Sequence, residues 1–118
     1  MTWGSLSGVG DKALDRLLRL AAPQPAGTLT EPPRLTGAAT DVPSSAVFCT
    51  DNGLSTALVE GLVAAGEPSA RALTDPRTCY FDLPTGHWPM LSAPEALTAV
   101  LLRAAAGEGH RLTAPATP

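Results

Sequence analysis

Two short apolar stretches decide the fold: Ser45-Ala46-Val47-Phe48-Cys49-Thr50 and Thr78-Cys79-Tyr80-Phe81-Asp82-Leu83. The first has no polar residues alternating with its apolar ones, which is typical of a strand buried on both faces. Between the two stretches, residues 54–65 predict a helix, and Gly66 predicts its end. The apolar stripe of this helix is formed by Leu54, Leu58, Leu62 and Ala65. Strand, helix and strand in this order predict a right-handed crossover between two parallel strands.

A further helix is predicted after the second stretch. Ser92-Ala93-Pro94-Glu95 has the Ser-x-x-Glu pattern of a capping box, in which the two side chains satisfy free backbone N–H groups. Gly107 predicts the end of this helix, whose apolar face is formed by Leu97, Val100, Leu101 and Ala104. Because two parallel strands do not make a stable sheet alone, the α/β segment 44–107 is interpreted as the strand–helix–strand–helix end of a larger sheet.

The flanking regions are simpler. Residues 10–22 carry apolar side chains at helical spacing, with Asp11 as the expected N-cap and Pro23 as the stop. Residues 23–43 contain five prolines, which deny the backbone its donors and predict an extended, proline-rich connector. The polar segment 108–118 is expected to be a frayed tail.

Composition limits the kind of protein this is. The hydrophobic fraction of 44% is typical of a globular chain, and the net charge of −3 argues against a nucleic-acid or anionic-membrane surface. No stretch approaches the roughly 18 apolar residues needed to span a bilayer, and the N-terminus has no signal-peptide pattern. We therefore expect a cytoplasmic protein whose cysteines, Cys49 and Cys79, are reduced core residues. The single lysine and the abundant Ala, Gly, Pro and Leu suggest a bacterial gene of high GC content.

The segment most informative about function is Leu83-Pro84-Thr85-Gly86-His87-Trp88-Pro89-Met90, between the second strand and the last helix. In open α/β sheets, catalytic groups gather at the carboxyl ends of the strands. Gly86 permits a φ value that turns His87 towards a site above the sheet, and Pro84 and Pro89 stiffen the turn. A histidine held there is suited to act as a general base near neutral pH.

A carboxylate stands at the end of the first strand, in Thr50-Asp51-Asn52-Gly53. One crossover before the histidine, Asp51 is placed to accept the Nδ1 proton of His87, fix its tautomer and stabilise the imidazolium. The alternative interpretation is that Asp-Asn-Gly after a strand is ordinary turn and helix-capping chemistry.

These segments resemble the last two strand–helix units of α/β-hydrolases, from about Asp41 to Arg103. The run 82–97, DLPTGHWPMLSAPEAL, is similar to the "G-H-x-P…P-E-x-L" ending of these enzymes, and residues 23–28 resemble the segment after the cap helices of bacterial members. The resemblance implies the C-terminal part of a serine hydrolase or esterase, with residues 1–22 as a helical remnant of the cap or a preceding region. It also implies His87 as general base, Asp51 as its orienting acid, a small ester or amide substrate, and no cofactor.

The nucleophile that such an enzyme needs is missing from the sequence. No G-x-S-x-G elbow occurs, since Gly4-Ser5-Leu6-Ser7-Gly8 has leucine at the centre and no strand before it. An oxyanion loop of the H-G-G-G type is also missing. Asn52 beside Asp51 leaves open which of the two faces the histidine, and some family members take their acid from an earlier strand. We therefore expect the chain by itself to be inactive as a hydrolase.

Two other residues are weaker candidates. Trp88 would line an acyl pocket or, as an ordinary core residue, pack over the last helix. His110 lies in the polar tail and is expected to have no partner. With the two histidines 23 positions apart and no cysteine pair at ligand spacing, no metal site is expected.

Two functions therefore follow from the sequence. The first is a partial serine hydrolase whose nucleophile lies outside these residues. The second is a non-catalytic binding or assembly module derived from an α/β-hydrolase, which would self-associate through an uncovered sheet edge.

Overall fold

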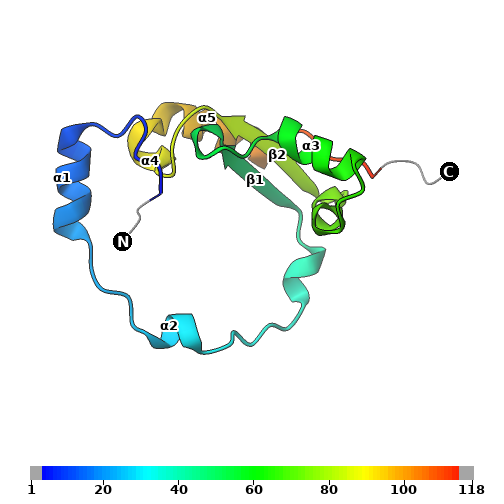
Figure 1. The fold of residues 1–118 in the computed structure, drawn as a ribbon, viewed down its shortest axis with the longest axis horizontal. Coiled ribbons are helices and arrows are strands. Elements are labelled where there is room, and N and C mark those ends of the chain that lie inside the picture. The colour runs from blue at the N-terminus through cyan, green and yellow to red at the C-terminus, as the bar shows by residue number, and fades with distance from the viewer. Residues whose placement is uncertain (1–3, 115–118) are drawn as a thin grey trace. The chain divides into compact units, whose positions relative to one another are not determined.

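The computed structural model describes residues 4–114. Its strands are β1 (Ser44–Cys49) and β2 (Thr78–Leu83), and its helices are α1 (Asp11–Leu20), α2 (Gly27–Thr30), α3 (Thr56–Ala64), α4 (Pro89–Ser92) and α5 (Pro94–Ala105) (Figure 1). Three 3-10 helices cover Ala38–Asp41, Thr50–Asn52 and Pro68–Thr74. The described chain divides into two compact units, residues 4–9 with 43–114, and residues 10–42.

The two strands pair in parallel, as the order of elements predicts. Ser44 stands opposite Thr78, and the register continues to Cys49 opposite Leu83. The connection between the strands contains α3 and the 3-10 helix Pro68–Thr74, which was not predicted. The larger unit is thus a mixed α/β structure built on a two-stranded parallel sheet.

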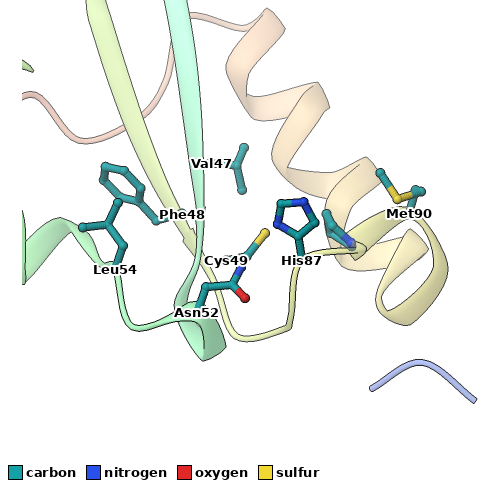
Figure 2. Close-up of a pocket in the computed structure, with 8 residues that line it drawn as sticks. Val47, Phe48, Cys49, Asn52, Leu54, His87 and Met90 are labelled. Atoms are coloured by element: carbon teal, nitrogen blue, oxygen red, sulfur yellow. The ribbon is translucent and has the colours of Figure 1, made fainter. Parts of the chain in front are cut away.

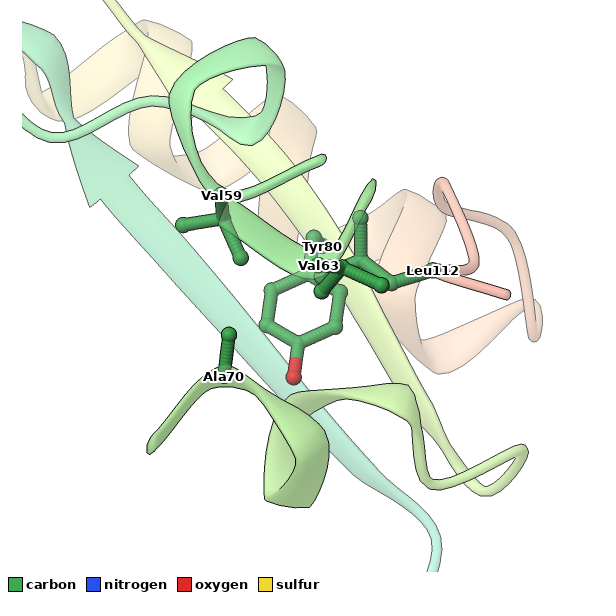
Figure 3. Packing of buried hydrophobic residues seen from close by; sticks show 5 residues of the cluster. All are labelled: Val59, Val63, Ala70, Tyr80 and Leu112. Carbon is green, nitrogen blue, oxygen red and sulfur yellow. The ribbon is translucent and has the colours of Figure 1, made fainter. Parts of the chain in front are cut away.

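One face of the sheet packs against the crossover. Tyr80 of β2 is 3% exposed and stacks on Phe48 of β1, with ring centroids 5.4 Å apart. Its hydroxyl donates a hydrogen bond of 2.8 Å to the Leu73 carbonyl. The cluster around it contains Val59, Val63, Ala70 and Leu112 (Figure 3).

The opposite face packs against α5. Because side chains alternate along a strand, Phe81 and Leu83 point away from Tyr80. Both join a second buried cluster with Val100 of α5. The unit therefore has three layers, with α3 and α5 on the two faces of the sheet (Figure 1).

Helix α3 turns a different face to the core than the predicted stripe. Val59 and Val63 are buried, whereas Leu58 and Leu62 are 47% and 40% exposed. The start of α3 fixes this rotation, since the Asp82 carboxylate of β2 accepts hydrogen bonds of 2.9 Å from the amide and the hydroxyl of Thr56. This anchor holds the face that begins at Thr56 against the sheet.

The predicted helix ends are confirmed for α3 and α5. Gly66 and Gly107 follow these helices with φ values of 76° and 78°, the left-handed conformation that glycine adopts without strain. The predicted capping box is wrong. The N-cap of α5 is Ala93, and the Ser92 hydroxyl instead bonds the Thr85 hydroxyl and the Trp88 carbonyl.

The smaller unit, residues 10–42, has no comparable core. Its helix α1 contains no buried residue, and the N-cap is Gly10 with Asp11 in the first turn, not Asp11 as predicted. The proline-rich connector contains two short helical turns, α2 and Ala38–Asp41, between extended segments.

The described part of the C-terminal segment, residues 108–114, lies against β2. His110 and Tyr80 exchange backbone hydrogen bonds of 2.7 and 2.9 Å, forming an antiparallel bridge. Leu112 is only 3% exposed. This segment, expected to fray from Glu108, therefore covers the outer edge of β2. Among the described helices, none has the length and apolar character needed to cross a bilayer.

Candidate functional site

A cavity of about 370 Å³ lies at the carboxyl end of β1. Three consecutive β1 residues, Val47 to Cys49, line it. Because their side chains alternate between the two faces of the sheet, the cavity lies along the edge of β1. Its polar groups are Cys49, Asn52 and His87, and its apolar wall is formed by Val47, Phe48, Leu54, Pro89 and Met90 (Figure 2). The loops after the two strands therefore meet at one small cavity, as the rule for open α/β sheets predicts.

His87 stands in the loop between β2 and α4, with an exposed imidazole on the cavity wall. Its backbone amide donates a hydrogen bond of 2.8 Å to the Ser5 carbonyl. The Trp88 ring stands edge-on to the imidazole, with centroids 5.7 Å apart and planes at 80°. His87, Pro89 and Met90 line the cavity, whereas Trp88 does not. Trp88 therefore contacts the histidine ring from outside the cavity lining.

Gly86 is required for a reason that the sequence did not reveal. Its φ is outside the positive range, so the predicted special conformation is not adopted. Instead, a Cβ at this position would stand 2.5 Å from the Ser5 carbonyl oxygen and 2.9 Å from the Ser7 amide nitrogen. The glycine therefore allows the N-terminal segment to cross directly over the histidine loop.

The segment 4–9 is the unexpected part of the site. Gly4, with φ of 70°, lies against the imidazole, since a Cβ there would meet His87 Cγ at 2.5 Å. Further along, Gly8 approaches Ser92. In the sequence this segment stands out only as a failed nucleophile elbow, and no local pattern indicates that it packs on a loop some eighty positions away.

Asp51 lies close to the histidine loop, as expected from the strand ends. Its amide donates a hydrogen bond of 3.1 Å to the Thr85 carbonyl, which extends the pairing of the strands into the two loops. Its exposed carboxylate accepts a hydrogen bond of 2.6 Å from the Ser7 hydroxyl. Among residues 4–114, this serine and not the His87 imidazole is the side chain that bonds the carboxylate.

The two cysteines occupy different environments. Cys79 is buried at 6% exposure, as predicted, whereas Cys49 is half-buried and opens into the cavity. Both are free thiols. Burial raises the pKa of the Cys49 thiol, because the thiolate loses hydration in this setting. Cys49 was expected in the core and lies instead in the cavity lining, which its position as the last β1 residue could have indicated.

The other histidine is not isolated. His110 Nε2 lies 2.5 Å from Glu60 Oε1 of α3, so the expectation that it has no partner is wrong. This pair ties the C-terminal segment to α3 and lies on a different part of the unit from His87. In the described part of the chain, no group of three His, Cys, Asp or Glu side chains is placed to hold a metal ion.

The arrangement offers a defined set of chemical groups. The cavity combines an exposed imidazole, a thiol and a side-chain amide with apolar walls, and a carboxylate stands on the adjoining loop. These are the elements of proton transfer next to an apolar substrate group. No protein-family profile, characterised protein or solved structure matches this chain.

Proposed function

We propose that this chain carries the acid–base half of a serine-hydrolase site of the α/β-hydrolase kind. His87 serves as the general base and Asp51 as the acid that orients it, while the attacking serine comes from residues outside these 118. The substrate is a small ester or amide with an apolar group, and the apolar wall of the cavity is its binding surface. No cofactor takes part.

The observation that carries this proposal is the hydrogen bond from the Asp51 amide to the Thr85 carbonyl, at 3.1 Å. It joins the two loops at the carboxyl edge of a parallel sheet and brings an acid to the loop of a histidine. A serine triad needs these two groups at neighbouring strand ends. The Ser7 hydroxyl occupies Oδ2 of the Asp51 carboxylate and competes with His87 for it, while Oδ1 can still accept the Nδ1 proton of His87.

In the assembled site, the steps follow from the groups present. The imidazole of His87 takes the proton of the serine as it attacks the carbonyl carbon, and later gives this proton to the leaving group. Asp51 holds the imidazole in the tautomer that carries the proton on Nδ1. Because the attacking serine is supplied from elsewhere, this chain alone contributes proton transfer without turnover.

The decisive experiment uses the source cells. An antibody against residues 82–95 identifies the native protein, and a serine-directed fluorophosphonate probe reports an active nucleophile. The proposal expects a band that reacts with both and loses probe labelling in a His87→Ala strain, with His110→Ala as the matched control. An antibody-reactive band that is never labelled, alone or in complex, overturns the proposal.

Positioning of the imidazole is tested separately on the purified chain. The ¹⁵N shifts of His87 report which ring nitrogen carries the proton. Ser7→Ala frees the Asp51 carboxylate and is expected to increase the fraction protonated on Nδ1, whereas Ser7→Ala combined with Asp51→Asn reverses the increase. Identical spectra for the two variants contradict the role of Asp51.

An assembly function is the second candidate. β1 pairs with β2 alone among residues 4–114, and the exposed side chains of the unit include Leu58, Leu62, Leu101 and Leu102. An open strand edge and exposed leucines on the same unit favour association with another chain. This function predicts a dimer or a heterocomplex in analytical ultracentrifugation, and a stable monomer at high concentration argues against it.

A cytoplasmic location is part of the proposal, because both cysteines are free thiols.

A further inference from the structure

We infer that Cys49 is an acyl-accepting nucleophile, with His87 as its base, for a small activated ester or thioester that carries an apolar acyl group. The inference goes beyond the proposed function because every group that it needs belongs to this chain. It rests on one cavity of about 370 Å³ that holds a thiol, an imidazole and an amide together.

The first step of the argument is placement. Cys49 ends β1, and His87 follows β2, so the parallel register brings both to the same edge of the sheet. Figure 2 shows the Cys49 sulfur pointing towards the His87 ring across the cavity. The thiol is half-buried, and the imidazole is exposed, so both are open to a ligand in the cavity.

The second step is activation of the thiol. Burial raises the pKa of Cys49, so the group is a protonated thiol near neutral pH and attacks only where a base removes its proton. His87 is the one base among the described residues that line this cavity. A nucleophile and a base form the basic unit of covalent catalysis when they come within hydrogen-bond reach, which we expect of Cys49 and His87 with a ligand in the cavity.

The third step is recognition of the acyl group. Five of the eight lining residues are apolar, and Leu54 and Met90 contribute side chains more than two-fifths exposed. Such a wall accepts a short hydrocarbon chain and excludes charged groups. Asn52 provides an N–H donor for the carbonyl oxygen, which gains negative charge during the attack.

The reaction balances without any further reagent. The Cys49 sulfur forms a bond to the acyl carbon as its proton passes to His87, and the bond from that carbon to the leaving oxygen or sulfur breaks. The leaving group then takes the proton from His87, giving an alcohol or thiol and a thioester on Cys49. Water is not consumed, so one acyl group accumulates on each chain.

The test is acylation of the purified chain by p-nitrophenyl esters. Release of p-nitrophenolate gives the rate, and mass spectrometry locates the acyl group. Cys79 is an internal control, because it is a buried thiol of the same chain outside the cavity. The expected result is one acyl group on Cys49, none on Cys79 while the chain stays folded, and no acylation of Cys49→Ala, which has no nucleophile at this position.

The role of His87 is tested by His87→Gln against His110→Gln. Loss of a general base is expected to slow acylation about 100-fold at neutral pH, and the control variant is expected to react like the original chain. The unreactive Cys79 confirms that each variant is folded. Equal rates for the two variants overturn the inference.

A further measurement leaves both Cys49 and His87 unchanged. The apolar wall predicts faster acylation by the butyrate than by the acetate ester, and Leu54→Asp is expected to remove this preference. Equal labelling of Cys49 and Cys79, or no preference for the longer chain, overturns the inference. Neither result affects the fluorophosphonate experiment, which reports a serine, so the two proposals fail separately.

Discussion

Helices α1 and α3 show that regular apolar spacing and burial are separate properties in this molecule. α1 has the more regular apolar stripe, yet it contains no buried residue. α3 has apolar residues on several sides, yet it buries Thr56, Val59 and Val63 against the sheet. Apolar spacing alone therefore indicates a helix, but burial depends on a neighbouring surface, which β2 provides for α3.

The largest effect on the free energy of unfolding is expected in the cluster around Tyr80, between the sheet and α3. Tyr80→Ala removes a ring that is stacked on Phe48 and packed against Val59, and we expect a loss of about 3–5 kcal/mol in the free energy of unfolding. Tyr80→Phe is the matched control and removes only the hydrogen bond to Leu73, at about 1 kcal/mol. Urea unfolding measures both, and equal losses would mean that the hydroxyl, not the packing, holds this core.

A smaller effect is expected where the N-terminal segment crosses the histidine loop. Gly86→Ala places a methyl group against the backbone of Ser5 and Ser7, which cannot yield as a side chain would, and should cost about 1–3 kcal/mol. Gly61→Ala in α3 is the control, because it has open space around it and should stabilise the helix by about 1 kcal/mol. Thermal unfolding distinguishes the two, and a neutral Gly86→Ala would show that the segment 4–9 is displaced at no cost.

Within α1, a core-like substitution should have little effect. Leu17→Ala lies in a helix without buried residues, so we expect a change within about 0.5 kcal/mol. The same chemical unfolding measurement applies. A loss as large as that of a core leucine would break the comparison, since it would mean that α1 is packed against a partner surface.

The smallest effect concerns the turn before β2. Side-chain and backbone hydrogen bonds from Arg77 lower the pKa of Asp75 to about 2. Because the folded pKa lies below the unfolded value, the stabilisation is complete above about pH 4 and is lost as the pH falls towards 2. A carboxyl NMR titration checks the value, and Arg77→Gln should raise the pKa of Asp75 towards its ordinary range while Arg103→Gln leaves it unchanged.

Much of the α/β unit follows from local patterns. The two strands, the crossover helix and the two terminal glycines were predicted, because each depends on residues close together in the sequence, and the parallel pairing follows from the order of these elements. The rotation of α3 was not, because the anchor of Thr56 is Asp82, twenty-six positions away. The Ser92 capping box failed for a different reason, since the nearby Thr85 hydroxyl and Trp88 carbonyl bond the Ser92 hydroxyl in place of the helix start.

The candidate site also has a part that the sequence predicts and a part that depends on contacts between distant residues. His87 and Asp51 were expected on neighbouring loops because strand ends share an edge, and in the structure the Asp51 amide bonds the Thr85 carbonyl of the histidine loop. Their roles stay predictions. The contact of Ser7 with Asp51 is invisible in the sequence, because it joins residues forty-four positions apart without any shared motif.

The bridge between His110 and Tyr80 limits how this sheet can grow. It occupies the outer edge of β2, so a strand from another molecule can add only beside β1 within the described part of the protein. Two copies that pair through their β1 edges leave neither edge open, and they are related by a two-fold axis. The proposed assembly through the sheet would therefore stop at a closed pair, because residues 4–114 leave no second edge from which a filament could continue.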